Sequence, residues 1–194
     1  MSVLRQFVAP TGSAEAKLGT NPLTYAFPTS NGSVVYDTTT AAMAFFGVVE
    51  AKLKGDPLPE GTAYDADGNP TTDAAKALDG SVSTLAGHKG FGLSLLVQLL
   101  GGPFSDAAYI GQHEEKGAGT FVMAIEPGLL VGKDAYFKAA DELVAQVKSA
   151  RPLPGKQVLL PGEHGDALTK QAVDTDQIEI ANAIWQELND FVSK

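Results

Sequence analysis

The stretch from Leu85 to Gly102 constrains the fold of this chain more than any other. It opens with a glycine-flanked basic turn, Gly87-His88-Lys89-Gly90, and continues into a run whose side chains are almost all apolar. A helix that is apolar on nearly every side is expected to lie buried in a core. The two polar exceptions, Ser94 and Gln98, are spaced i, i+4 and share one stripe of the predicted helix.

This turn and helix allow two interpretations. A buried helix whose N-terminus carries a lysine and free backbone N–H groups can bind an anion. The simpler interpretation is a core helix preceded by a tight turn, because glycine-basic turns are common and non-specific. The residues alone leave both open, and Gly101-Gly102-Pro103 ends the helix in either case.

Charge and apolar content narrow the partners of the chain. Its 194 residues include 23 acidic and 14 basic side chains, for a net charge of −9, which argues against nucleic acid and against anionic membrane surfaces. No apolar run reaches the roughly 20 residues that span a bilayer. The N-terminus lacks the pattern of a secretory signal, and there are no cysteines. We therefore expect a cytoplasmic protein with no nucleic-acid and no membrane partner.

The order of predicted elements indicates an α+β fold. Strands over 23–27 and 33–36, joined by the turn Thr29-Ser-Asn-Gly32, predict a hairpin, and a helix is expected over about 39–54 with Gly55 as its stop. Five further elements are expected: a short helix capped by Asp73, a buried strand over 120–125, an amphipathic helix over 134–149, a short strand over 157–160, and a tail helix over 178–192 with Trp185, Leu188 and Phe191 inward. Without a regular βαβ alternation, part of the sheet is expected to be antiparallel.

Few residues suggest chemistry by their spacing. The run Asp37-Thr38-Thr39-Thr40 predicts either the N-cap of the following helix or a strand end that binds hydroxyl groups. The histidines His88, His113 and His164 have no metal-ligand spacing, so we expect no metal site. The glycine-rich fingerprint of a Rossmann fold, a phosphate loop and a serine nucleophile elbow are all absent from the sequence.

Four short motifs, in order along nearly the whole chain, carry a family resemblance. They are Lys17-Leu-Gly-Thr-Asn-Pro22, Asn69-Pro-Thr-Thr-Asp73 followed by Leu78-Asp-Gly80, Gly87-His-Lys-Gly-Phe-Gly-Leu93, and Leu160-Pro-Gly-Glu163. Together they resemble the malate/L-lactate dehydrogenase family of NAD(P)-dependent oxidoreductases, with relatives such as ureidoglycolate dehydrogenase, diketogulonate reductase and piperideine-2-carboxylate reductase. The resemblance implies a non-Rossmann nucleotide-binding domain over 1–163, with a mixed, largely antiparallel sheet flanked by helices, and a C-terminal helical tail over 164–194.

The resemblance also implies an activity and a site. Hydride transfer is expected between NAD or NADP and a small-molecule 2-hydroxy or 2-keto acid. The positions that match the family's cofactor-binding residues are Asp37, Thr38, Thr39, His88, Lys89, Gly90 and Lys170. Thr20 and Asn21 match positions on the substrate side, near the reacting end of the cofactor.

Two departures from the family pattern qualify this expectation. Thr38-Thr39 stands where family members commonly have Met-Ala, and the family's proton-transfer histidine belongs to a helical segment ahead of the Gly-Thr-Asn-Pro motif. The catalytic residue is therefore left unassigned, and the alternative is a non-catalytic nucleotide-binding or interaction remnant of the family. A homo-oligomer, most simply a homodimer, is expected because an uncovered apolar face would otherwise aggregate.

Overall fold

The computed structural model describes residues 6–110 and 119–193. Within them the chain is a mixture of helices and short antiparallel strands, which confirms the predicted α+β class. The elements are β1 (Leu23–Thr29), β2 (Gly32–Thr38), α1 (Phe45–Lys54), β3 (Ala63–Tyr64), β4 (Pro70–Thr71), α2 (Ala74–Asp79), β5 (Ser81–Val82), α3 (His88–Gly101), the 3-10 turn η1 (Pro103–Ser105), α4 (Lys133–Lys148), α5 (Glu163–Thr175) and α6 (Asn182–Val192).

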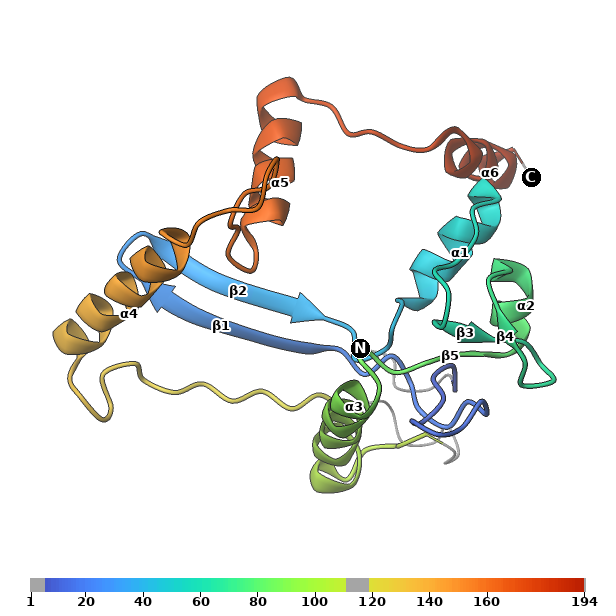
Figure 1. The fold of residues 1–194 in the computed structure, drawn as a ribbon, viewed down its shortest axis with the longest axis horizontal. Coiled ribbons are helices and arrows are strands. Elements are labelled where there is room, and N and C mark those ends of the chain that lie inside the picture. The colour runs from blue at the N-terminus through green and yellow to red at the C-terminus, as the bar shows by residue number, and fades with distance from the viewer. Residues whose placement is uncertain (1–5, 111–118, 194) are drawn as a thin grey trace. The chain divides into compact units, whose positions relative to one another are not determined.

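These elements form two compact units. Unit 1 consists of residues 1–23, 38–121 and 179–194, and it contains β3–β5, α1–α3 and α6. Unit 2 consists of residues 24–37 and 122–178, and it contains the β1–β2 hairpin with α4 and α5. Figure 1 shows the hairpin strands running in opposite directions through a tight turn, so the predicted hairpin is confirmed.

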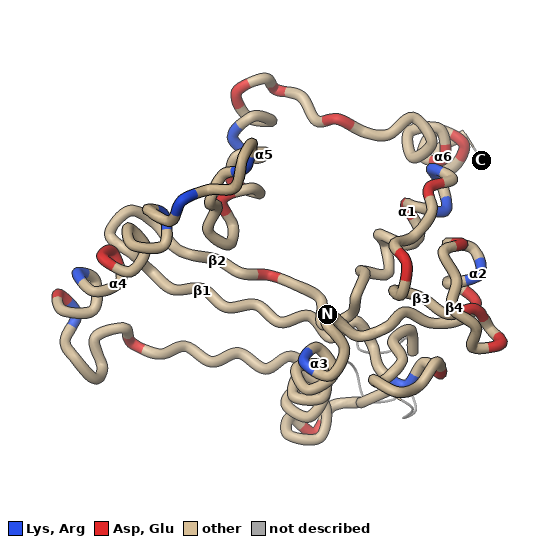
Figure 2. Tube along the Cα trace, viewed as in Figure 1, with Lys and Arg blue, Asp and Glu red and all other residues tan. Residues whose placement is uncertain are grey.

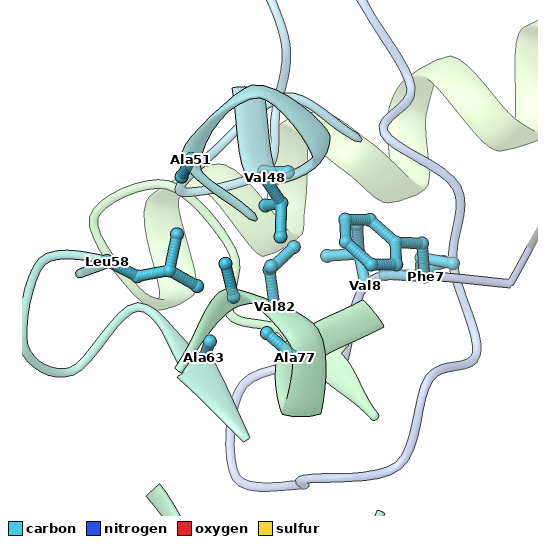
Figure 3. Close-up of a cluster of buried hydrophobic side chains, with 11 residues drawn as sticks. Phe7, Val8, Val48, Ala51, Leu58, Ala63, Ala77 and Val82 are labelled. Carbon is cyan, nitrogen blue, oxygen red and sulfur yellow. The ribbon is translucent and has the colours of Figure 1, made fainter. Parts of the chain in front are cut away.

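A small sheet and two helices form the core of unit 1. The strands lie in the order β4-β3-β5, with Ala63 opposite both Thr71 and Val82. The N-terminal segment extends this sheet, because Ala9 donates to the Val82 carbonyl at 2.8 Å and Val82 donates back to Phe7 at 2.9 Å. Figure 3 shows Phe7, Val8 and Val82 packed against Val48 of α1, all of them buried.

The helices α1 and α2 begin differently. Asp73 caps α2, as the sequence predicts, by accepting from the backbone N–H groups of Ala75 and Lys76. The predicted cap of α1 by Asp37 or Thr38 is wrong, because β2 continues to Thr38 and α1 begins only at Phe45, after Ala44. Gly55 does end α1, in the left-handed conformation at φ 73°.

Helix α3 is not buried all round, contrary to the prediction. Its buried residues are Gly90, Ser94, Gln98 and Gly101, so the small and polar stripe faces the protein. The leucines occupy the opposite arc, with Leu96 and Leu99 47% and 50% exposed. The apolar run between two glycine turns located the helix, but it could not show that the small and polar stripe would be the face that turns inward.

Unit 2 is held by polar contacts between α4 and the hairpin. The Tyr136 hydroxyl donates to the Pro28 carbonyl at 3.1 Å, and the Ser30 N–H donates to the Asp141 carboxylate at 3.0 Å. Hydrogen bonding from the Ser30 side chain, together with this backbone bond, lowers the pKa of Asp141. Helix α4 matches its predicted range closely. None of the described residues of unit 2 is buried.

Three further predictions are wrong. Residues 120–125 form no strand and are not buried, since Val122 is 82% exposed, and residues 157–160 also lie outside any strand. The tail helix exists as α6 and contacts α1 within unit 1, but its large side chains Trp185, Leu188 and Phe191 are exposed rather than inward. An apolar pattern identifies a surface that must be covered, but it does not identify what covers it.

Candidate active site

Thr40 lies at the centre of the predicted site residues in unit 1. Its backbone N–H donates to the Thr20 carbonyl at 3.0 Å, and its hydroxyl lies 2.9 Å from the Asn21 carbonyl and 3.2 Å from that of Thr20. Its own carbonyl accepts from the Leu85 N–H at 3.0 Å. Thr40 is fully buried, so these bonds are shielded from water.

Thr39 joins the same cluster. Its hydroxyl donates to the Thr20 carbonyl at 2.7 Å and accepts from the Ala41 N–H at 3.1 Å. The Thr39 hydroxyl therefore donates its proton within the protein, and it holds the residue that follows β2 against Thr20. Thr38, one residue earlier, donates to the Thr39 carbonyl and is partly exposed.

Asn21 connects this cluster to α3. Its backbone is left-handed at φ 39°, a conformation that asparagine adopts more readily than most residues. The side-chain amide donates to the carbonyl and the hydroxyl of Ser94, at 3.1 and 3.0 Å. The inward stripe of α3 thus holds the predicted substrate-side residue, and among the described residues the buried Asn21 Oδ1 has no hydrogen-bond partner.

The basic turn at the start of α3 is tied to the same cluster through Leu85. Gly90 donates its N–H to the Leu85 carbonyl at 2.8 Å, and a Cβ at Gly90 would lie 2.1 Å from that oxygen. Only glycine fits this approach. Gly87 precedes the helix at φ 62°, and no side chain of residues 6–110 or 119–193 caps the N-terminus of α3.

His88 and Lys89 stand exposed on this turn. Within the part of the chain that the structure describes, the Lys89 side chain makes no ion pair or hydrogen bond. Figure 2 shows basic colouring beside the label of α3. An uncapped helix N-terminus beside an unpaired lysine is an arrangement that suits an anionic group such as a phosphate.

A cavity of about 370 Å³ in unit 1 borders this turn. Gly87 and Ala86 line it from one side, and the hydroxyl-bearing residues Thr11, Ser83 and Thr84 line it elsewhere. Thr84 also fixes the turn, since its hydroxyl donates to the Gly87 carbonyl at 2.9 Å.

The remaining predicted residues, Asp37 and Lys170, belong to unit 2. Asp37 is exposed near the end of β2 and accepts from the Thr24 hydroxyl at 2.5 Å. Lys170 lies on α5 and pairs with Asp174 at 2.7 Å on the exposed surface. Hydrogen bonds within unit 1 therefore join Thr20, Asn21, Thr39 and the lysine turn. Asp37 and Lys170 lie in unit 2.

Sequence reasoning missed Thr40 and Ser94 as members of this cluster. Thr40 is the last hydroxyl-bearing residue of the Asp37–Thr40 run, and Ser94 belongs to the polar stripe of the apolar helix.

No group of three or more His, Asp or Glu side chains in residues 6–110 and 119–193 could hold a metal ion, and His113 lies outside those residues. None of the described helices is long and apolar enough to cross a membrane.

This α+β arrangement, with the glycine-lysine turn opening a helix and no Rossmann fingerprint, defines a non-Rossmann class of domain. A family model described as malate/L-lactate dehydrogenase matches residues 1–189. The chain belongs to this family, as the four sequence motifs predict.

Individual relatives agree with the family match. The chain is 34% identical to L-sulfolactate dehydrogenase of Methanocaldococcus jannaschii, over 95% of this chain and 58% of that protein. It is 36% identical to L-lactate dehydrogenase of Cupriavidus necator, over 93% of this chain and 54% of that protein. The solved structure of sulfolactate dehydrogenase from M. jannaschii matches with a TM-score of 0.79 and 32% identity, covering 97% of this chain and 56% of that one. The chain therefore spans little more than half the length of these relatives.

Proposed function

We propose that this chain provides the nicotinamide-nucleotide-binding part of an oxidoreductase that transfers a hydride between NAD or NADP and a 2-hydroxy or 2-keto acid. The observation that carries the proposal is the hydrogen-bonded cluster that joins Thr20, Asn21, Thr39 and the lysine turn in one unit. Family membership supports it, since matched relatives are named lactate and sulfolactate dehydrogenases.

The residues present fit a dinucleotide. Lys89 and the start of α3 at His88 would hold the negatively charged pyrophosphate, while Gly90 would let the turn pack against Leu85. Thr38 at the end of β2 and the following Thr39 would lie along the cofactor. For Asp37 and Lys170, which belong to unit 2, the cofactor contacts are proposed from the matching family positions alone, with Lys170 on the adenosine side. Thr20 and Asn21 would face the nicotinamide and the acid, where the bound cofactor supplies the hydride chemistry.

We also propose a domain organisation, a location and a set of partners for the protein. The nucleotide-binding domain would extend over 1–163, with a helical tail over 164–194. The working protein would be a cytoplasmic homo-oligomer with small-molecule substrates and without nucleic-acid or membrane partners.

The proposal is tested by titrating the folded chain with NADH and with NADPH and measuring the heat of binding by calorimetry. We expect saturable binding of at least one of the two. A folded sample that binds neither would overturn it.

A second candidate is a nucleotide-binding or interaction module of the same family that does not catalyse. It is favoured by one observation, namely that Thr38-Thr39 stands where family members commonly have Met-Ala beside the cofactor. Turnover of pyruvate or oxaloacetate by the purified chain alone would exclude this candidate. Nucleotide binding without turnover would support it.

A further inference from the structure

Two segments far apart in the sequence meet at a single buried residue, Thr40. One is the Thr20–Asn21 segment, and the other is Leu85, which leads into the lysine turn. The backbone of Thr40 binds both segments, and its hydroxyl adds bonds to the first alone.

We propose that Thr40 is a positioning residue, whose hydroxyl holds the Thr20–Asn21 segment in place for the nicotinamide end of the cofactor. This inference rests on the proposed function and assigns a role to a residue that itself touches no ligand. Thr40 is fully buried and therefore acts only through the groups it binds.

The geometry explains why the hydroxyl matters in particular. Asn21 has a left-handed backbone, so a bond to its carbonyl stabilises a conformation that other contacts must otherwise maintain. The hydroxyl of Thr40 supplies that bond at 2.9 Å, while Ser94 holds the Asn21 side chain from α3. Removing the hydroxyl frees the carbonyl of Asn21 but leaves the backbone bond from Leu85 to Thr40, and with it the lysine turn, intact.

The hydroxyl therefore acts on one end of the site only. Thr40→Val preserves the shape of the side chain and removes the hydroxyl, whereas Thr40→Ser keeps it. We expect Thr40→Val to weaken NADH binding by at most about 10-fold, because part of the binding free energy must then order the Thr20–Asn21 segment that the hydroxyl held. ADP-ribose, which lacks the nicotinamide, should bind Thr40→Val within about 2-fold of the wild-type affinity.

A matched control separates positioning from a general loss of stability. Ser81 is also fully buried, and its hydroxyl donates to the Ala14 carbonyl at 2.7 Å, with neither residue in the site cluster. Ser81→Ala should lower the melting temperature yet leave the affinity for both ligands unchanged.

The experiment is a titration of the four proteins (wild type, Thr40→Val, Thr40→Ser and Ser81→Ala) with NADH and with ADP-ribose. Selective loss of NADH affinity in Thr40→Val, restored in Thr40→Ser, is the expected result. Equal loss of both ligands, no loss, or failure of Thr40→Ser to restore binding would overturn the inference while leaving the proposed function standing. If the wild type binds neither ligand, the proposed function fails and the inference fails with it.

Discussion

Gly90 and Gly92 lie two residues apart on α3, yet their surroundings differ completely. A Cβ at position 90 would come within 2.1 Å of the Leu85 carbonyl, whereas a Cβ at position 92 would meet nothing within 4 Å. Packing therefore requires glycine at position 90 of the glycine-lysine-glycine signature, whereas at position 92 it leaves room for a side chain.

The two glycines give a matched pair of substitutions. Gly90→Ala should lower the free energy of unfolding by about 1–3 kcal/mol, because overpacking forces the backbone of the turn to shift. Gly92→Ala should raise it by about 0.5–1 kcal/mol, since alanine favours a helix interior over glycine. Urea denaturation measures both. Equal effects at the two positions would show that the turn does not pack against Leu85 as described.

Glu163 at the start of α5 ties that helix to the end of α4. Its carboxylate lies 2.7 and 2.9 Å from Lys148 Nζ and accepts from the Leu160 N–H at 2.8 Å. The Lys148 ammonium and the Leu160 amide lower the pKa of Glu163 below its ordinary value of 4.5. The late Pro-Gly-Glu motif therefore has a local structural role in unit 2, namely to begin α5 beside α4.

This lowered pKa predicts a pH dependence with a definite sign. A carboxyl group whose pKa is lowered by folding contributes stability above its unfolded pKa, and that contribution is lost as the pH falls through the folded value. Wild type should therefore be more stable than Glu163→Gln near neutral pH, and the difference should shrink below pH 4.5. Unfolding curves of both proteins from about pH 3 to pH 7 measure it. A difference that stays constant with pH would show that the pair with Lys148 does not form in solution.

The sequence predicted elements better than it predicted their surroundings. The hairpin, the Asp73 cap, α3 and α4 follow from turn residues, capping and periodicity, which are local effects. The inward face of α3 and the unpaired segment 120–125 depend on contacts between distant parts of the chain, which apolar patterning does not encode. The first turn of α5 carries Glu163 and Asp166, an acidic N-terminal signal from which the helix could have been predicted.

The candidate site shows the same division. Family motifs indicated Thr20, Asn21, Thr39 and the lysine turn, and these do lie in one hydrogen-bonded cluster. Thr40 and Ser94 stood out in the local sequence, but their link to Asn21 could not be predicted from it, because Asn21 is 19 residues from Thr40 and 73 from Ser94.

At the scale of the whole molecule, many large apolar side chains of the described residues are exposed, and such surface favours association. The outer leucines of α3 and the large side chains of α6 are exposed, and unit 2 has no buried residue among those described. Association between copies would remove such surface from water.

Light scattering on the purified chain checks this expectation. We predict a particle of at least twice the mass of a single chain, with apolar burial as the driving force. A clean monomer at micromolar concentration would refute the homo-oligomer.

The central claim is that the lysine turn of α3 binds the phosphates of a nicotinamide dinucleotide. The most direct measurement compares NADH and NADPH affinity in wild type, Lys89→Gln and Lys138→Gln, where Lys138 is an exposed lysine on α4 that serves as the control. We predict that Lys89→Gln weakens binding about 10-fold or more, as expected for a lost charge-assisted hydrogen bond, and that Lys138→Gln leaves it unchanged. Wild-type affinity in Lys89→Gln, or an equal loss in both variants, would contradict the account.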